Sequence, residues 1–200
     1  RPSPFARGAW RRKPSAPGQS LHFNTDGSNL PWVVENLKKD DKKFTQWIEH
    51  IQTALPDIEN IETVERPEDR HRYIKVKYKN GIEVPSWLVS DGTLRLLALT
   101  LPAYLKELSG VFLIEEPENG IHPKAIECVF QSLSSVYNAQ ILLASHSPVI
   151  LGMMKLKDVL CFGKTSESTT DIVSGIEHPK LRDWKGNPNL NLLFASGILS

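Results

Sequence analysis

The sequence predicts an α/β fold that contains a mostly parallel sheet, an antiparallel β meander and a helical segment. Two short, wholly apolar runs in residues 111–144 flank a helical stretch, as expected for a strand, a helix and a second strand of a parallel sheet. Residues 58–84 alternate between apolar and polar side chains, as half-buried antiparallel strands do. The 200 residues, 40% hydrophobic and 24% charged, supply a core for one domain or two small ones.

The composition excludes several classes of protein. No apolar run approaches the roughly 18 residues that a membrane span needs. The formal net charge of +1 favours neither nucleic acid nor a membrane surface as a partner. The two cysteines, Cys128 and Cys161, are too widely separated for a disulfide framework or a cysteine zinc site. We therefore expect a protein of the reducing cytoplasm.

The first of three expected parts, residues 1–24, is a basic, proline-rich arm or linker. Residues 1–17 hold no acid, and their four prolines exclude a continuous helix or a central strand. This segment fits a flexible linker, or a contact with nucleic-acid phosphates in which Phe5 and Trp10 stack on bases. The basic side chains are Arg1, Arg7, Arg11, Arg12 and Lys13. Because the chain starts at Arg1 rather than Met, we expect a fragment or a processed protein.

The second part, residues 25–85, combines helices with antiparallel strands. Ser28 followed by Pro31 predicts a helix start, and a stripe of apolar residues predicts a helix over about 41–54 that Pro56 ends. Three strands are expected over 58–64, 73–78 and 82–84, the last two joined by a tight turn at Asn80-Gly81. Lys75, Lys77 and Lys79 share one face, which is expected to be solvated, with a nucleic-acid contact as the less favoured alternative.

The third part, residues 86–200, should form the parallel sheet. A helix is expected over about 92–108, ending at Gly110. Residues 111–114 and 141–144 predict strands buried on both faces, connected by a helix over about 123–137 in a right-handed crossover. A later strand near 159–162 and a helix near 189–196 complete the expected elements.

Charged and polar side chains follow both apolar strands. Glu115 and Glu116 end the first strand, and His146 follows the second. Ligands of open parallel sheets bind beyond the carboxyl ends of the strands, so Glu116 and His146 should share one edge close to a terminal phosphate. Paired carboxylates there favour Mg²⁺, with the second acid free to activate water and the imidazole to donate to a phosphate oxygen. The alternative is that both acids are ordinary surface residues.

Ser90-Asp91-Gly92 stands just before a predicted helix. Its hydroxyl and backbone N–H groups would lie at the positive end of the helix dipole, which suits an anion. A plain N-cap serine with a turn glycine is the alternative for this tripeptide taken alone.

Four runs in this order resemble the motifs of ABC-type ATPases. Residues 89–95 (VSDGTLR) resemble the signature motif, 111–117 (VFLIEEP) the Walker B strand with its catalytic glutamate, 118–123 (ENGIHP) the D-loop, and 144–148 (ASHSP) the H-loop. Their order and spacing are similar to the branch of RecF-like, SMC-like and OLD-like ATPases, the AAA-type predicted ATPases of bacterial defence and repair. The resemblance implies a P-loop NTPase-like (ABC ATPase) half. It covers about residues 86–163 firmly, and residues 25–85 and the C-terminal tail more loosely.

The resemblance also implies roles for matching residues. Glu115 would hold Mg²⁺ through water, Glu116 would be the catalytic base and His146 the switch histidine near the γ-phosphate. Asn119 and Gly120 fall in the D-loop, which crosses to a second subunit. Ser90, Asp91 and Gly92 would contact ATP bound by that subunit, in a head-to-tail dimer of this chain or with a homologous subunit. The family pattern assigns no role to His122, which we expect to be a turn residue of the D-loop, with a role at the subunit interface as the alternative.

Two departures from the family pattern matter. The Walker B acid is usually Asp, whereas here it is Glu115. The chain also lacks the Walker A pattern, a glycine-rich phosphate loop ending in Gly-Lys-Ser/Thr: Gly163-Lys164-Thr165 has Asp158 where the earlier glycine should be. We therefore expect the C-terminal half of an ATPase, which binds ATP poorly until an N-terminal Walker A half completes it.

The expected function is ATP hydrolysis with Mg²⁺ at a dimer interface, coupled to DNA or a nuclease-like effector in bacterial defence or repair. Two alternatives belong to other classes. One is a scaffold that binds nucleotide without hydrolysing it, and the other is a DNA-binding module led by the basic arm.

Overall fold

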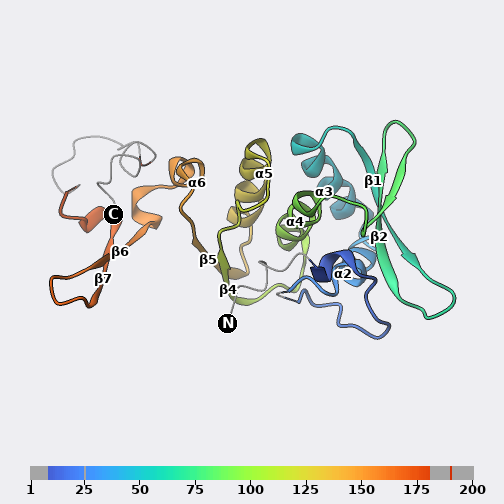
Figure 1. The fold of residues 1–200 in the computed structure, drawn as a ribbon, viewed down its shortest axis with the longest axis horizontal. Helices are drawn as coiled ribbons and strands as arrows, with labels where there is room; N and C mark the ends of the chain where they lie inside the picture. Colours follow the sequence, from blue (N-terminus) through green and yellow to red (C-terminus); the bar gives the residue numbers. More distant parts are fainter. Residues whose placement is uncertain (1–8, 25, 181–189, 191–200) are drawn as a thin grey trace. The chain divides into compact units, whose positions relative to one another are not determined.

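The computed structural model describes residues 9–24, 26–180 and 190 (Figure 1). The chain divides into two compact units, Arg1–Ala144 and Ser145–Ser200, which we describe separately. A parallel strand pair, antiparallel strands and helices confirm the predicted α/β class. No helix of the described ranges is long and apolar enough to cross a membrane.

Three helices open the first unit: α1 (Ala9–Arg12), α2 (Leu30–Leu37) and α3 (Asp41–Ala54). Pro31 lies in the first turn of α2, as predicted, although Asn29 rather than Ser28 is its N-cap. The α3 helix has the predicted bounds because the Asp40 carboxylate accepts a hydrogen bond from the Lys43 N–H at 3.2 Å and caps its start. The apolar stripe of α3 is buried and includes Trp47 and Ile51.

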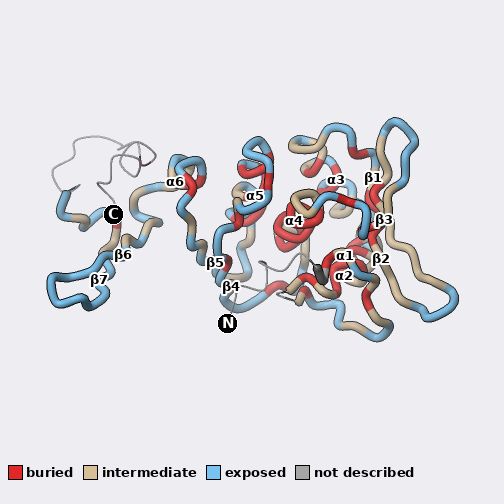
Figure 2. Tube along the Cα trace, in the orientation of Figure 1, coloured by how far each residue is buried: buried red, intermediate tan, exposed pale blue. Residues whose placement is uncertain are grey.

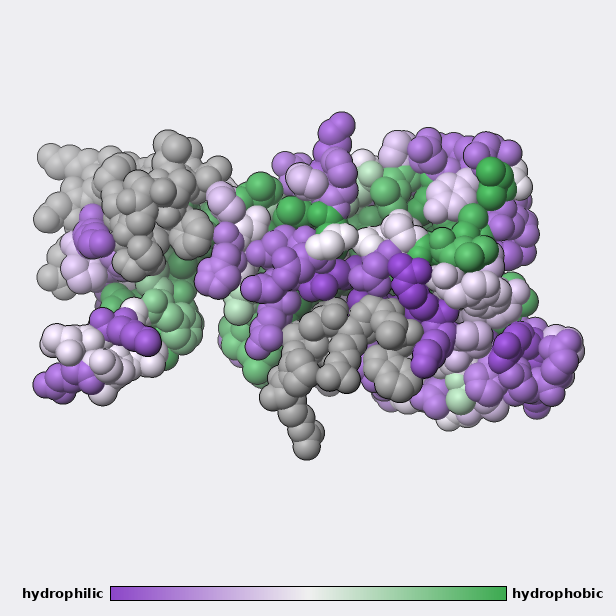
Figure 3. Space-filling model, viewed as in Figure 1, coloured by the Kyte–Doolittle hydropathy of each residue, from purple (hydrophilic) through white to green (hydrophobic). Residues whose placement is uncertain are grey.

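The antiparallel meander consists of β1 (Ile58–Glu65), β2 (Arg72–Tyr78) and β3 (Glu83–Pro85). Ile74 and Val76 form its buried face, as the alternation predicts. On the other face, Lys75 lies 2.9 Å from Glu62 and 2.6 Å from Glu83. Figure 3 shows the meander as largely hydrophilic in this view. Lys77 lies 3.4 Å from Glu59, so carboxylates of the same sheet balance Lys75 and Lys77, and this face is not purely basic.

The described part of the N-terminal segment packs against this first unit. Ser15 pairs with Arg72 through two backbone hydrogen bonds of 2.7 and 2.9 Å. Arg12 Nη1 donates to the Val89 carbonyl at 2.7 Å, and the Ser86 hydroxyl donates to the Arg12 carbonyl at 2.9 Å. Arg11 is only 1% exposed. Residues 11–15 thus hold the loop that leads into the next helix, instead of extending away as a linker.

That helix, α4 (Asp91–Thr100), is followed by the 3₁₀ turn η2 (Leu101–Tyr104). The predicted span of 92–108 is therefore too long. Pro102 explains the difference, because proline has no N–H to continue the α-helical hydrogen bonds and disfavours a helical residue before it. Residues 94–100 of α4 are all buried, so α4 is the central helix of this unit, as Figure 2 shows.

The parallel pair consists of β4 (Gly110–Glu115) and β5 (Ala139–Ala144), connected by α5 (Pro123–Ser134). The register runs from Gly110 opposite Ala139 to Glu115 opposite Ala144. The prediction that both faces are buried is wrong. Ile114 is 3% exposed, but Val111 on the other face is 60% exposed and Leu113 69%. Within the described residues, this second face of the strand pair is therefore open to solvent.

The second unit contains α6 (Pro148–Met153), the 3₁₀ turns η3 (Leu156–Asp158) and η4 (Gly175–Glu177), and a hairpin of β6 (Leu160–Lys164) and β7 (Thr170–Ser174). The hairpin contains the strand predicted near 159–162. Lys164 pairs with Thr170 beside the hairpin turn, so Gly163-Lys164-Thr165 is not a phosphate loop. Of the helix predicted over 189–196, only Leu190 lies among the described residues.

Candidate functional site

The carboxyl end of β4 carries the two predicted acids. Glu115 is opposite Ala144 in the strand pair, and the Glu116 N–H donates to the Ala144 carbonyl at 2.7 Å. Both glutamates are exposed. Within the described residues, no side chain forms a hydrogen bond or ion pair with the Glu115 carboxylate. Its oxygens are therefore accessible to a hard cation, which fits Mg²⁺ held by one or two carboxylates together with water and phosphate.

Glu116 has an unusual backbone conformation that several contacts maintain. Its φ is +46°, in the left-handed region, where a residue other than glycine costs about 1–3 kcal/mol. Arg95 Nη2 donates to its carbonyl at 2.7 Å, and the Asn119 N–H donates to the same oxygen at 3.0 Å. The Asn119 side-chain amide donates to Glu116 Oε2. These bonds fix both the backbone and the carboxylate of Glu116.

The signature-like loop lies against the D-loop-like turn. A Cβ added to Gly92 would stand 2.4 Å from the Gly120 carbonyl oxygen, so only glycine allows this approach. Gly120 itself has φ of +72°. The structure thus brings Gly92, Gly120 and Glu116 into one neighbourhood, although they come from three different motifs.

Ser90 acts as the N-cap of α4. Its hydroxyl oxygen accepts a hydrogen bond from the Thr93 N–H at 3.1 Å and lies 2.8 Å from the Thr93 hydroxyl. The capping role considered from sequence is therefore present. The first-turn N–H groups of α4 remain at the positive end of the helix, where they suit a phosphate.

Asp91 has cationic neighbours that sequence reasoning missed. Its carboxylate lies 3.9 Å from Arg12 Nε. Burial lowers the pKa of Arg11 and of Arg95, and in both cases the Asp91 charge is the largest opposing influence. Asp91 therefore balances buried arginines, which explains why an acid stands in a loop expected to approach phosphate.

His146 belongs to the second unit, two residues beyond the end of β5, and it is exposed. Its neighbour Ser147 accepts a hydrogen bond from the Ile150 N–H and caps α6. The proximity of His146 to Glu116 stays a prediction. In the first unit, His122 Nδ1 accepts from the Lys124 N–H at 3.2 Å, so His122 caps α5 as a turn residue.

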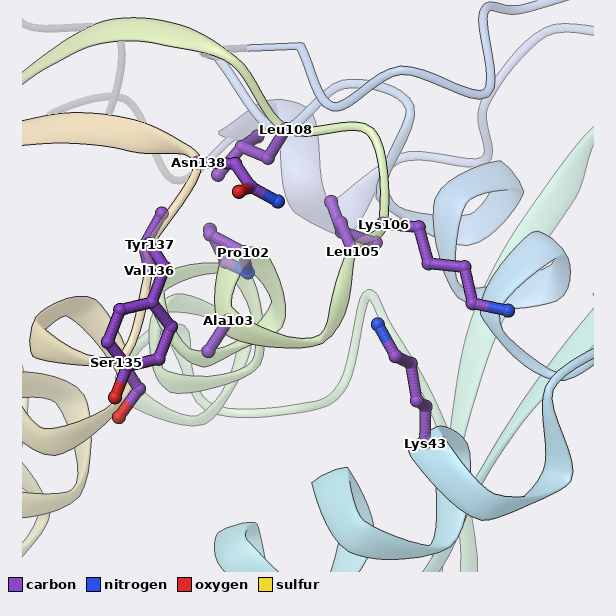
Figure 4. A pocket seen from close by; sticks show the side chains of 10 residues that line it. All are labelled: Lys43, Pro102, Ala103, Leu105, Lys106, Leu108, Ser135, Val136, Tyr137 and Asn138. Atoms are coloured by element: carbon purple, nitrogen blue, oxygen red, sulfur yellow. The ribbon is translucent and has the colours of Figure 1, made fainter.

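Two pockets of the described chain lie away from the carboxyl end of β4. The larger, of about 610 Å³, is lined by residues that include Tyr104 and Leu108. Residues 9–24, 26–180 and 190 contain no group of three or more His, Cys, Asp or Glu that could hold a metal ion. A pocket of about 260 Å³ is lined by Leu108 and Asn138, which precede β4 and β5, and by Lys43 and Lys106 (Figure 4). It therefore lies at the opposite end of the strand pair from Glu115. Lys106 there is paired with Asp40 at 2.7 Å.

The α/β fold of this chain is similar to that of SMC ATPase heads, which is of the P-loop NTPase type. A crystal structure of the Smc head domain with a coiled coil and joint from Pyrococcus yayanosii matches with a TM-score of 0.51 and 15% identity, over 74% of this chain and 29% of that chain. An SMC ATPase structure concerned with ATP-driven dimerization and DNA-stimulated activation matches with a TM-score of 0.53 and 13% identity, over 76% of this chain and 98% of that chain. At such identities these likenesses show the fold alone.

The sequence itself identifies the family. Residues 3–152 match the family model described as "AAA domain, putative AbiEii toxin, Type IV TA system", and the chain belongs to this family. The comparison with curated proteins found no significant match. The chain spans less than a third of the first Smc head structure.

Proposed function

We propose that this chain is the signature and Walker B half of an ATPase that hydrolyses ATP with Mg²⁺ at a dimer interface. The observation that carries the proposal is the convergence of three motifs on one end of β4. Glu115 and Glu116 end the strand, Asn119 holds the Glu116 carboxylate, and Gly92 packs on Gly120. The ATPase-type fold and the family are consistent with this chemistry.

Each residue has a distinct task in the proposed reaction. Glu115 would hold Mg²⁺, which neutralises charge that develops on the phosphates. Glu116 accepts a proton from the attacking water, with its carboxylate oriented by Asn119. His146 donates a hydrogen bond to a terminal phosphate oxygen. Ser90, Asp91 and Gly92 offer the N-terminal N–H groups of α4 to ATP held by the second subunit.

A further segment must supply the phosphate loop. The 200 residues contain no Gly-x-x-x-x-Gly-Lys-Ser/Thr run, so they lack the backbone cradle and lysine for the β- and γ-phosphates. The uncovered face of the parallel pair supports a docking role, since Val111, Leu113 and Leu142 are 60%, 69% and 39% exposed. We propose that the segment carrying the phosphate loop covers this face and adds strands to the sheet.

The wider role that we propose is cytoplasmic, in bacterial defence or repair. The family description names a type IV toxin–antitoxin system, and a structurally similar protein is described in terms of ATP-driven dimerization and DNA stimulation. We infer head-to-tail dimerisation and coupling to DNA or a nuclease-like effector. A DNA contact led by the N-terminal arm is less favoured, because Arg11 is buried and Arg12 donates to the Val89 carbonyl.

Replacing Glu116 tests the proposal. In the complete protein, with its phosphate-loop segment present, Glu116→Gln should lower ATP turnover by about a hundredfold or more, because the water loses its base. ATP binding and dimerisation should be retained. The matched control is Glu127→Gln, which changes an exposed glutamate of α5 and should leave turnover unaltered. Turnover of Glu116→Gln equal to wild type would remove Glu116 from this role.

A further inference from the structure

Arg95 links the helix that begins at the signature-like loop to the residue proposed as the catalytic base. It lies in α4, four residues after the N-terminal residue Asp91, and is 6% exposed. Its Nη2 donates to the Glu116 carbonyl at 2.7 Å. The contact joins residues 21 positions apart, so α4 and the end of β4 cannot shift independently without breaking it.

The Arg95 side chain is buried close to acidic groups. Burial lowers the pKa of Arg95, and the charges of Asp91, Glu118 and Glu116 raise it. No described residue accepts a hydrogen bond from its Nε. The bond to the Glu116 carbonyl holds the Arg95 head group, and it is strengthened because the donor is charged.

A second contact runs parallel to the first. Gly92, at the start of the same helix, packs against the Gly120 carbonyl. Arg95 and Gly92 together join α4 to both ends of residues 116–120. Glu116, with a left-handed backbone at φ of +46°, is the end of this segment that Arg95 contacts.

We propose that Arg95 is a positioning residue that sets the backbone of Glu116 and makes the activity of this glutamate depend on the position of α4. This inference rests on the proposed function, because it gives the signature loop, which would contact ATP of the second subunit, a direct connection to the base. When α4 moves, Arg95 moves the Glu116 carbonyl, and the carboxylate follows through the Asn119 contacts.

The test compares Arg95→Met with a matched variant of another partly buried arginine. Arg72→Met removes a side chain that is 13% exposed and paired with Glu35 and Glu65 in the meander. In the complete protein, Arg95→Met should lower kcat about a hundredfold and change KM for ATP by less than about threefold, since misplaced catalytic groups lose rate rather than ground-state binding. Arg72→Met should leave kcat within about twofold of wild type.

A second measurement does not depend on ATP. Hydrogen exchange of the Glu116 amide, which donates to Ala144, should become faster in Arg95→Met and stay unchanged in Arg72→Met. Arg95→Lys keeps the charge with a shorter, single-ended donor, so it should recover part of the rate, to about a tenfold loss. If Arg95→Met fails to fold, Arg95→Lys carries the test.

The outcomes separate the two proposals. The positioning role is overturned if Arg95→Met has the kcat and the Glu116 amide exchange of wild type. If only Arg95→Lys folds, a wild-type kcat in that variant overturns it. Either result leaves the proposed function standing. Wild-type turnover in Glu116→Gln would overturn the proposed function, and faster amide exchange in Arg95→Met would then still support the structural link.

Discussion

Replacing Gly92 by alanine tests how closely the signature loop and the D-loop-like turn are joined. The added Cβ would stand 2.4 Å from the Gly120 oxygen, whereas ordinary contact begins near 3.4 Å. The two backbones must therefore separate by about 1 Å. Both are part of secondary structure or a tight turn, and overpacking of this kind typically costs about 1–3 kcal/mol. A displacement of about 1 Å at a catalytic group also costs about a hundredfold in rate.

Urea denaturation followed by tryptophan fluorescence, to which the buried Trp47 contributes, measures the stability loss, and ATP turnover of the complete protein measures the rate loss. Gly163→Ala is the control, since its added Cβ meets no atom within 4 Å. We expect Gly92→Ala to lower the urea midpoint and turnover, and Gly163→Ala to change neither. Equal stability and turnover for Gly92→Ala and wild type would refute the close packing of Gly92 on Gly120.

Two further predictions concern a buried histidine and the dimer. Burial lowers the pKa of His50 from its usual 6.5, so the folded protein resists a proton that the unfolded chain accepts. The resulting stability is present above pH 6.5 and is lost as the pH falls below it, by at most about 1.4 kcal/mol per pH unit. Urea denaturation at pH 7.5 and 5.5 should show this loss in wild type and a smaller loss in His50→Asn. Equal pH dependence in the two proteins would contradict the assignment to His50. In the complete protein, Ser90→Arg should abolish ATP-dependent dimerisation, measured by light scattering, because the arginine places bulk at the nucleotide of the second subunit. The control Ser134→Arg, at the exposed end of α5, should leave dimerisation unchanged. Normal dimers of Ser90→Arg would count against the signature assignment.

Local sequence signals predicted most elements of the fold. The apolar stripe and Pro56 placed α3 at its observed bounds, and the alternation with Asn80-Gly81 predicted the meander. Two predictions failed for reasons of context. The helix after Ser90 was expected to run through Pro102, and the strand around Leu113 was expected to be covered on both faces. Hydrophobicity indicates that a face can be buried, but it does not say that the covering segment is present.

Sequence reasoning found the candidate site residues whose own motif indicates a chemical role. It missed the contacts that join residues of different motifs. Consecutive acids after an apolar strand pointed to Glu115 and Glu116. The Arg95 bond to Glu116 and the packing of Gly92 on Gly120 join positions far apart in the sequence, so no local sequence pattern predicts them. Arg12 was assigned to an open basic arm, whereas its donation to Val89 supports the signature-like loop from within.

An experimental structure of the complete protein with Mg²⁺ and a non-hydrolysable ATP analogue would test the central claim most directly. We predict that the terminal phosphate lies beside the carboxyl end of β4, one water molecule from the Glu116 carboxylate and within hydrogen-bonding reach of His146. A terminal phosphate bound elsewhere, or Glu116 and His146 at opposite ends of the sheet, would contradict the account.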